Sequence, residues 1–171
     1  MIRLRRIHRI AVADLTAVGD VLHAGGFRAA VIDVEPMLAF WGTADRAYAA
    51  ELSARVGTIL ARAPALGHVV LASNSRLVRL PAGEIAGRTI RTVTGARKPY
   101  RVHDWRSMPR PVAVVGDQIV TDGVLAWRLR ATFVQWRHAG RMPWWPRIQR
   151  TAGALALPLL FRTARAEEEV S

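Results

Sequence analysis

The sequence predicts an α/β fold in which helices cover a parallel sheet. Short apolar runs at 29–32, 68–72 and 111–115 have the length of buried strands, and polar residues follow each run. Segments with helical patterns separate these runs, and strands that alternate with helices pair in parallel, with helices on both faces. The length of 171 residues suits a single domain with a sizeable core.

The clearest helical pattern begins after Thr43, whose side chain suits an N-cap, and ends near Ala63 and Pro64. Its apolar residues recur every four positions and are Tyr48, Leu52, Val56 and Leu60. Such spacing places them on one face of a helix. The pattern therefore predicts an amphipathic helix between the first two strands.

The rest of the chain continues the alternation of strands and helices. We expect a short helix after Ser75, a strand over 89–93, a helix over 122–129 and a strand over 131–134. The sequence contains no internal repeat and no evident linker. We therefore expect one domain, 1–171, with a core of about 25–137 and a basic C-terminal extension at 138–171.

Three polar residues stand at the ends of the predicted buried strands. Asp33, Ser73 and Asp117 each come at or just after such an end. In a parallel sheet the carboxyl ends of the strands lie at one edge, and ligands bind at that edge. The pattern thus predicts that these three side chains meet at a ligand site.

The charge of the chain is strongly basic, with a formal net charge of +12 and a pI near 11.7. Such a surface attracts polyanions, although a genome rich in arginine codons would give the same excess. Of 25 basic residues, only Lys98 is a lysine. A single retained lysine indicates a role that needs a compact point charge, such as binding a phosphate oxygen.

Each candidate residue has an ordinary explanation when it is taken alone. Asp33 and Glu35, two positions apart after a strand, fit a turn, and Ser73 with Asn74 fits a helix cap. Lys98 fits a solvated loop, and Asp117 with Asp122 fits a capped loop. A common site is indicated only when the order of these residues along the chain is considered together with the predicted strands that they follow.

That order resembles the four motifs of the haloacid dehalogenase (HAD) superfamily. The series is strand-Asp-x-Glu, strand-Ser-Asn, Lys-Pro and strand-Gly-Asp-x-x-x-x-Asp. The segments VVLASNS (69–75), ARKP (96–99) and VVGDQIVTD (114–122) are similar to the small, cap-less YqeG-type phosphatases, which are related to phosphatidylglycerophosphate phosphatase. The resemblance covers roughly 29–134 and implies a three-layer Rossmannoid sandwich with a minimal cap or none.

The resemblance also implies roles for the candidate residues. Asp33 would be the nucleophile that forms an aspartyl-phosphate. Mg²⁺ would lie between Asp33, Asp117, the backbone carbonyl of Glu35 and the phosphate, with Asp122 supporting the metal shell. The phosphate would be bound by Ser73, Asn74 and Lys98. We therefore expect a Mg²⁺-dependent phosphatase that acts on a phosphorylated small molecule or a lipid phosphate.

The first motif departs from the usual Asp-x-Asp-x-Thr-Leu and reads DVEPML. Glu35 stands where the general acid is normally an aspartate, and its extra methylene displaces the carboxylate by about 1 Å, which can cost about 10²-fold in rate. Met37 replaces the threonine, and Pro36 lacks a backbone N–H. Three outcomes stay open: a slow or specialised phosphatase, a diverted reaction, or a binding module without hydrolysis.

The C-terminal part favours an anionic partner. Between Gly123 and Ala166 there are eight arginines and no acidic residue, and the stretch includes Trp144, Trp145 and the apolar run 152–161. These features suit an anionic membrane surface, but a C-terminal helix packed on the domain and broken by Pro158 is the slightly preferred explanation. We do not expect nucleic acid as a partner, because the arginines form no recognisable binding motif.

Composition and the N-terminus bear on location and oxidation state. The chain has no cysteine, which excludes disulfides and zinc-thiolate sites. The basic start, 1–10, is not followed by the apolar region and cleavage site of a signal peptide. We therefore expect a cytoplasmic protein, with a peripheral position at the membrane as the alternative.

Overall fold

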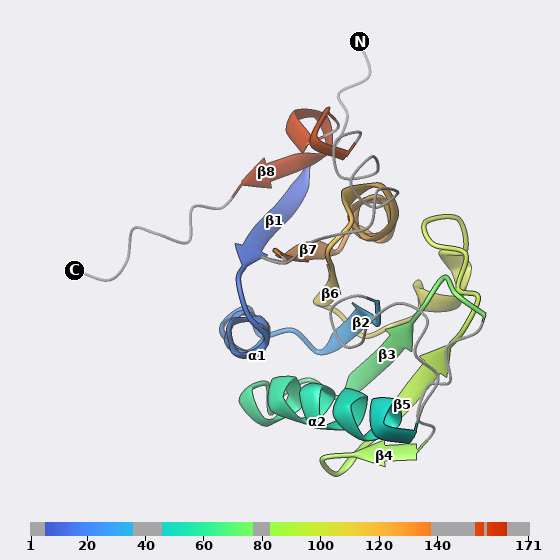
Figure 1. Ribbon diagram of the computed structural model, residues 1–171. Helices are drawn as coiled ribbons and strands as arrows, with labels where there is room; N and C mark the ends of the chain where they lie inside the picture. The colour runs from blue at the N-terminus through green and yellow to red at the C-terminus, as the bar shows by residue number, and fades with distance from the viewer. Residues whose placement is uncertain (1–5, 36–45, 77–82, 138–152, 156, 164–171) are drawn as a thin grey trace.

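A computed structural model describes residues 6–35, 46–76, 83–137, 153–155 and 157–163 of the chain (Figure 1). The fold is α/β, with an eight-stranded sheet in the order β4-β5-β3-β2-β6-β7-β1-β8. Neighbouring strands are parallel except for the antiparallel pair β4 and β5. The strands are β1 Ile7–Val12, β2 Ala29–Asp33, β3 His68–Ala72, β4 Gly83–Ile85, β5 Arg88–Val93, β6 Val112–Gly116, β7 Thr132–Trp136 and β8 Phe161–Thr163.

The order of the strands reverses at the centre of the sheet. From β2 the chain proceeds to β3 and β5 on one side, and from β6 it proceeds to β7 on the other. The central strands β2 and β6 are direct neighbours, with Ile32 opposite Val115. Crossovers that leave two adjacent strands in opposite directions open a crevice beyond their carboxyl ends, which is where ligands bind in open α/β sheets.

Helices cover both faces of the sheet (Figure 1). On one face, α1 (Leu15–Ala24) and α2 (Arg46–Arg62) pack on side chains such as Ile32 and Val115. On the other face, the short helices η1 (His103–Trp105), η2 (Ile119–Gly123) and α3 (Val124–Leu129) pack on side chains such as Val31 and Val114. Alternate residues of β2 and β6 thus enter the two cores, as expected for strands that are buried on both faces.

The predicted elements of the central sheet are confirmed. Strands lie at each predicted run, and the brief strand expected over 89–93 is β5. The amphipathic helix is α2, with Leu52, Val56 and Leu60 fully buried. The helix expected over 122–129 begins earlier than predicted, because the wider turn of η2 at Ile119–Gly123 precedes α3 and bends the chain back toward the end of β6.

The sheet extends beyond the expected core of about 25–137 at both ends. Before it, β1 pairs with β7 and leads into α1, and after it, β8 pairs with the other side of β1. The sequence of β1 is IHRIAV, in which a buried arginine interrupts the apolar pattern. Both β1 and α1 contribute side chains to the cores that the central strands form.

Several predicted features lie outside the described residues. These are the cap at Thr43, the motif positions Pro36 and Met37, the short helix after Ser75 and the tryptophans Trp144 and Trp145. Within the described part of the chain, no helix combines the length and the apolar character needed to cross a membrane.

Candidate active site

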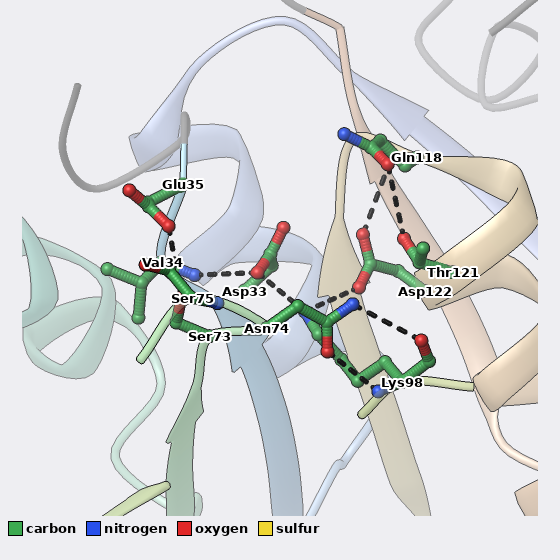
Figure 2. Close-up of polar contacts among 10 residues, drawn as sticks. All are labelled: Asp33, Val34, Glu35, Ser73, Asn74, Ser75, Lys98, Gln118, Thr121 and Asp122. Atoms are coloured by element: carbon green, nitrogen blue, oxygen red, sulfur yellow. Dashed lines mark hydrogen bonds and ion pairs between the residues drawn. The ribbon is translucent and has the colours of Figure 1, made fainter. Parts of the chain in front are cut away.

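The site lies beyond the carboxyl ends of β2, β3 and β6, at the crevice where the strand order reverses (Figure 2). Asp33 is the last residue of β2, Ser73 follows β3, and Asp117 follows β6. These strands are neighbours in the sheet, with Asp33 opposite Ala72 in the register of β2 and β3. The parallel register therefore brings together three side chains that are far apart in the sequence.

Three aspartates form a buried cluster at this point. One carboxylate oxygen from each of Asp33, Asp117 and Asp122 lies within 4.8 Å of the others. Asp122 is fully buried, and Asp33 and Asp117 are 7% and 6% exposed. Asp122 reaches the cluster because η2 turns the chain back, with the Asp122 amide donating to the Gln118 carbonyl at 2.9 Å.

Gly116 makes room for this arrangement. A Cβ atom at Gly116 would lie 2.4 Å from the carboxyl carbon of Asp122 and 2.8 Å from its Cβ. Asp122 is fully buried, so its side chain has no free space into which to move. Glycine is therefore needed at position 116, because the Asp122 side chain occupies the space beside the end of β6.

Lys98 is the cation of the cluster (Figure 2). Its Nζ donates to Asp33 Oδ1 at 2.5 Å and to Asp122 Oδ1 at 2.7 Å. The side chain of Asn74 holds the backbone of this lysine: the Lys98 amide donates to Asn74 Oδ1 at 2.7 Å, and Asn74 Nδ2 donates to the Lys98 carbonyl at 3.2 Å. Asn74 thus positions the loop that carries Lys98.

The electrostatics of the cluster are dominated by burial and by like charges. Burial raises the pKa of Asp33 well above its usual value; the charges of Asp122 and Asp117 raise it further, and Lys98 opposes them. Burial alone would lower the pKa of Lys98, but Asp122 and Asp33 outweigh that effect and hold it above its usual value. Three ionised aspartates beside one ammonium leave two excess negative charges, which is costly in a buried site unless a cation or protons offset it.

Glu35 and Ser73 form the opposite wall of the site (Figure 2). Ser73 Oγ donates to Glu35 Oε2 at 3.0 Å and accepts from the Ser75 amide at 3.0 Å. Both residues line a pocket of about 250 Å³ together with the lysine and the nucleophile candidate. The lining residues are Asp33, Glu35, Ser73, Asn74, Ser75, Lys98, Gln118 and Thr121.

A second polar network supports the site from β1 and β7. Gln135 Nε2 donates to the backbone carbonyl of Asp117 at 3.1 Å. Arg9 donates to Gln135 Oε1 through Nε at 2.8 Å and through Nη2 at 2.5 Å. Arg9 and Gln135 are 7% and 6% exposed, so this chain of contacts fixes the Asp117 backbone from inside the core.

The structure brings the predicted site residues to one place but gives two of them contacts that the sequence did not indicate. Asn74, expected at the phosphate, lines the pocket, and its side chain also binds the Lys98 backbone. The carboxylate of Glu35 lies outside the aspartate cluster and accepts from Ser73. Arg9 and Gln135 are not identified from the sequence; the available signal is a glutamine that follows the apolar residues Phe133 and Val134.

The chemistry of the aspartate cluster fits a hard divalent cation. Mg²⁺ and Ca²⁺ prefer carboxylate and carbonyl oxygens, and a dication would balance the two excess negative charges of the cluster. Comparison with known proteins gives no match: no family model matches the chain, and no curated protein or solved structure does so. The geometry and the chemistry of the site therefore carry the functional assignment.

Proposed function

We propose that the protein is a Mg²⁺-dependent phosphomonoester phosphatase that acts through an aspartyl-phosphate on Asp33. One observation carries this proposal: the buried cluster of Asp33, Asp117 and Asp122, with Lys98 between two of them, lies at the ligand-binding crevice of the sheet. An aspartate beside a lysine and a cation site has what is needed to attack phosphorus while the charge on the phosphate is neutralised.

The proposed reaction has two displacements. Asp33 attacks phosphorus, the ester P–O bond breaks, and the leaving oxygen takes a proton from the Glu35 carboxyl group. Glu35 then accepts a proton from a water that attacks the same phosphorus, which releases inorganic phosphate and restores the Asp33 carboxylate. Both residues line the same pocket, which supports this division of roles.

The remaining residues bind and orient. Asp33, Asp117 and Asp122, with the backbone carbonyl of Glu35, would hold Mg²⁺, which supplies positive charge where the phosphate dianion would otherwise be repelled. Lys98 and the Ser73 hydroxyl would bind the phosphate oxygens as charge spreads over them. Asn74 acts by positioning Lys98.

We further propose that the chain is a HAD-superfamily protein with a minimal cap. Support comes from the strand order, which reverses at β2, and from the four predicted motifs, which meet at the carboxyl ends of β2, β3 and β6 and at the Lys98 loop. The substrate is a phosphorylated small molecule or a lipid phosphate, and the protein acts in the cytoplasm or at its membrane surface. A polar pocket of about 250 Å³ suits the phosphate and a small part of the leaving group.

The first test is the release of inorganic phosphate from a panel of phosphomonoesters that includes lipid phosphates. We expect release with MgCl₂, none with EDTA, and none from D33N, because an amide is not a nucleophile for phosphorus. D20N is the matched control: it neutralises an exposed aspartate whose surface pair with Arg62 contributes little to stability. Failure of the wild type to release phosphate from any member of the panel would contradict the proposed function.

A second experiment addresses Asp33 directly. Crystals soaked with Mg²⁺ and fluoroberyllate, a mimic of an aspartyl-bound phosphoryl group, should show density on Asp33 Oδ and a metal beside Asp117. Density at another residue, or binding that D33N does not remove, would reject Asp33 as the nucleophile.

The alternative function is a diverted reaction or a binding module on the same scaffold. It is favoured by the substitution in the first motif and by the contact that holds the Glu35 carboxylate on Ser73. The variant E35D separates the two. A gain of phosphate release in E35D would indicate that Glu35 disables an ancestral phosphatase, whereas a large loss would show that Glu35 performs the acid–base step in the native site.

A further inference from the structure

We infer that the protein docks on anionic phospholipid bilayers through one surface beside β8, formed by Leu155, Leu159, Trp127, Arg128 and Arg130 and called here the C-terminal surface. Two exposed leucines provide its apolar part, and a basic pocket provides its charge. It is separate from the candidate active site, so the inference does not depend on the proposed phosphatase activity.

The apolar part belongs to the helical residues 153–155 and 157–160, next to β8 (Figure 1). Leu155 is 78% exposed and Leu159 is 54% exposed. They are four positions apart in the sequence. Bulky apolar side chains exposed to solvent near one another in the chain are a feature of interaction surfaces.

The segment is fixed to the domain, which leaves these leucines directed outward. Leu157 and Leu160 pack on the same core as Trp127. Gly153 lies so close to η2 that a Cβ there would be 2.7 Å from Ile119 Cβ. Because these contacts at both ends hold the segment, its inward positions are already filled, and the exposed leucines are available to a partner.

A basic pocket lies beside this segment. It has a volume of about 310 Å³ and is lined by Ile7, Trp127, Arg128 and Arg130. Ile7 pairs with Phe161, two residues after Leu159, so one wall of the pocket lies beside the strand that follows the helical segment. The lining of the pocket thus includes two arginines and a tryptophan.

Among the described residues, neither Arg128 nor Arg130 forms an ion pair with a carboxylate. Arg128 donates through Nη1 to the carbonyls of Pro99 and Tyr100, at 2.8 and 3.2 Å, so neutral acceptors orient it and its charge is retained. The sequence from Gly123 to Ala166, which includes this surface, contains no acidic residue.

This combination favours a bilayer over other polyanions. Leucines enter the boundary between headgroups and acyl chains, arginines bind lipid phosphates, and a tryptophan suits the interface. A nucleic acid offers phosphates but no apolar layer in which to bury two leucines. An acidic protein partner would need an apolar groove that matches the position of the leucines relative to the arginines. The partner is therefore an anionic lipid surface, with the headgroup phosphate in the basic pocket.

The test is sedimentation of the full chain with vesicles of phosphatidylcholine alone or of equimolar phosphatidylcholine and phosphatidylserine. We expect binding to the anionic vesicles only, weakened by added salt. L155S/L159S should lower the affinity at least about tenfold, because both side chains lose apolar burial. R130Q should lower it about fivefold, the share of one arginine near an anionic surface. All variants should keep the wild-type melting temperature, because the three side chains are exposed.

A matched control lies elsewhere on the molecule. R91Q removes an exposed arginine on β5, which is near the opposite end of the sheet from β8. It should bind as the wild type does. Equal binding to the two vesicle types, or undiminished binding of L155S/L159S, would overturn the inference. Binding of a DNA duplex that needs Arg130 but not the leucines, without vesicle binding, would identify a nucleic-acid surface instead.

Discussion

At the scale of single residues, Lys98 joins a peculiarity of composition to a structural cause. It is the only lysine of the chain, and its Nζ lies between Asp33 and Asp122. Lys98 is buried, with only 5% of its surface exposed. An ammonium group fits this space as a compact charge, and it keeps a third donor for a phosphate oxygen. A guanidinium group is planar and larger, and it needs acceptors in a forked arrangement.

The variant K98R should therefore fail although it preserves the charge. We expect phosphate release to fall by about two orders of magnitude or more, as for the loss of a donor at a developing charge. Stability should fall by about 1–3 kcal/mol because the larger group overpacks a filled site. R97K, at the exposed neighbouring position, is the control and should change neither quantity. Steady-state kinetics and urea denaturation measure the two effects, and wild-type kinetics of K98R would refute a need for lysine.

Much of the site could be predicted from residues at strand ends. Asp33, Ser73 and Asp117 lie together because parallel strands end at a common edge, a rule that needs no knowledge of side-chain contacts. The role of Asn74 could not be predicted, because its partner is a backbone group on a loop 24 residues away. The direction of the Glu35 carboxylate also depends on a tertiary contact, with Ser73.

At the scale of elements, β1 and β7 support the loop that follows β6. Arg9 on β1 donates to Gln135 on β7, which in turn donates to the Asp117 carbonyl. Burial lowers the pKa of Arg9, with a contribution from Arg137. A buried arginine costs stability, and Arg9 is connected through Gln135 to the Asp117 carbonyl, which indicates a positioning role rather than a contribution to the core.

Two variants separate positioning from stability. Q135L removes the acceptor of Arg9 and the donor to Asp117, so the free energy of unfolding should fall by about 3 kcal/mol and Mg²⁺ affinity by about tenfold. R9M/Q135L removes the unpaired guanidinium as well, so most of the stability should return while the affinity stays low. Urea denaturation and calorimetric titration with Mg²⁺ measure the two quantities. Recovery of both together in the double variant would contradict a positioning role.

The close approach of β6 and η2 gives a second prediction at this scale. G116A places a Cβ at 2.4 Å from the Asp122 carboxyl carbon, so we expect a loss of more than about 2 kcal/mol and displacement of Asp122 from the cluster. G57A, in α2, is the matched control, because a Cβ added there would have no described atom outside its own stretch of helix within 4 Å. The free energy of unfolding of G57A should rise by up to about 1 kcal/mol from helix propensity. Thermal unfolding tests both changes, and equal melting temperatures would show that the strand end tolerates a side chain.

At the scale of the whole molecule, the buried site and the chain as a whole have net charges of opposite sign. The molecule has a net charge of +12, yet its buried cluster carries two excess negative charges when ionised. The outer strands β1 and β8 could not be predicted, because β1 includes a buried arginine and β8 has only three residues. The central strands β2 and β6 could, because they are buried on both faces and are apolar up to their last residue.

The excess charge predicts that Mg²⁺ stabilises the fold. A cation that binds only the folded state, at about 100 times its Kd, adds about 2.7 kcal/mol, or roughly 5–10 °C in melting temperature for a domain of this length. EDTA should reverse the shift, and D20N should reproduce it because that aspartate lies at the surface.

The variant D117N provides the decisive comparison. Without Mg²⁺ it should melt at the wild-type temperature or above, because one of three mutually repelling buried carboxylates has become neutral. With Mg²⁺ it should gain little, because a ligand of the cation is lost. Calorimetric scans with and without Mg²⁺ measure both effects. A full Mg²⁺ shift in D117N would place the cation outside the aspartate cluster, whereas a destabilised apo form would show that Asp117 has a structural role independent of metal.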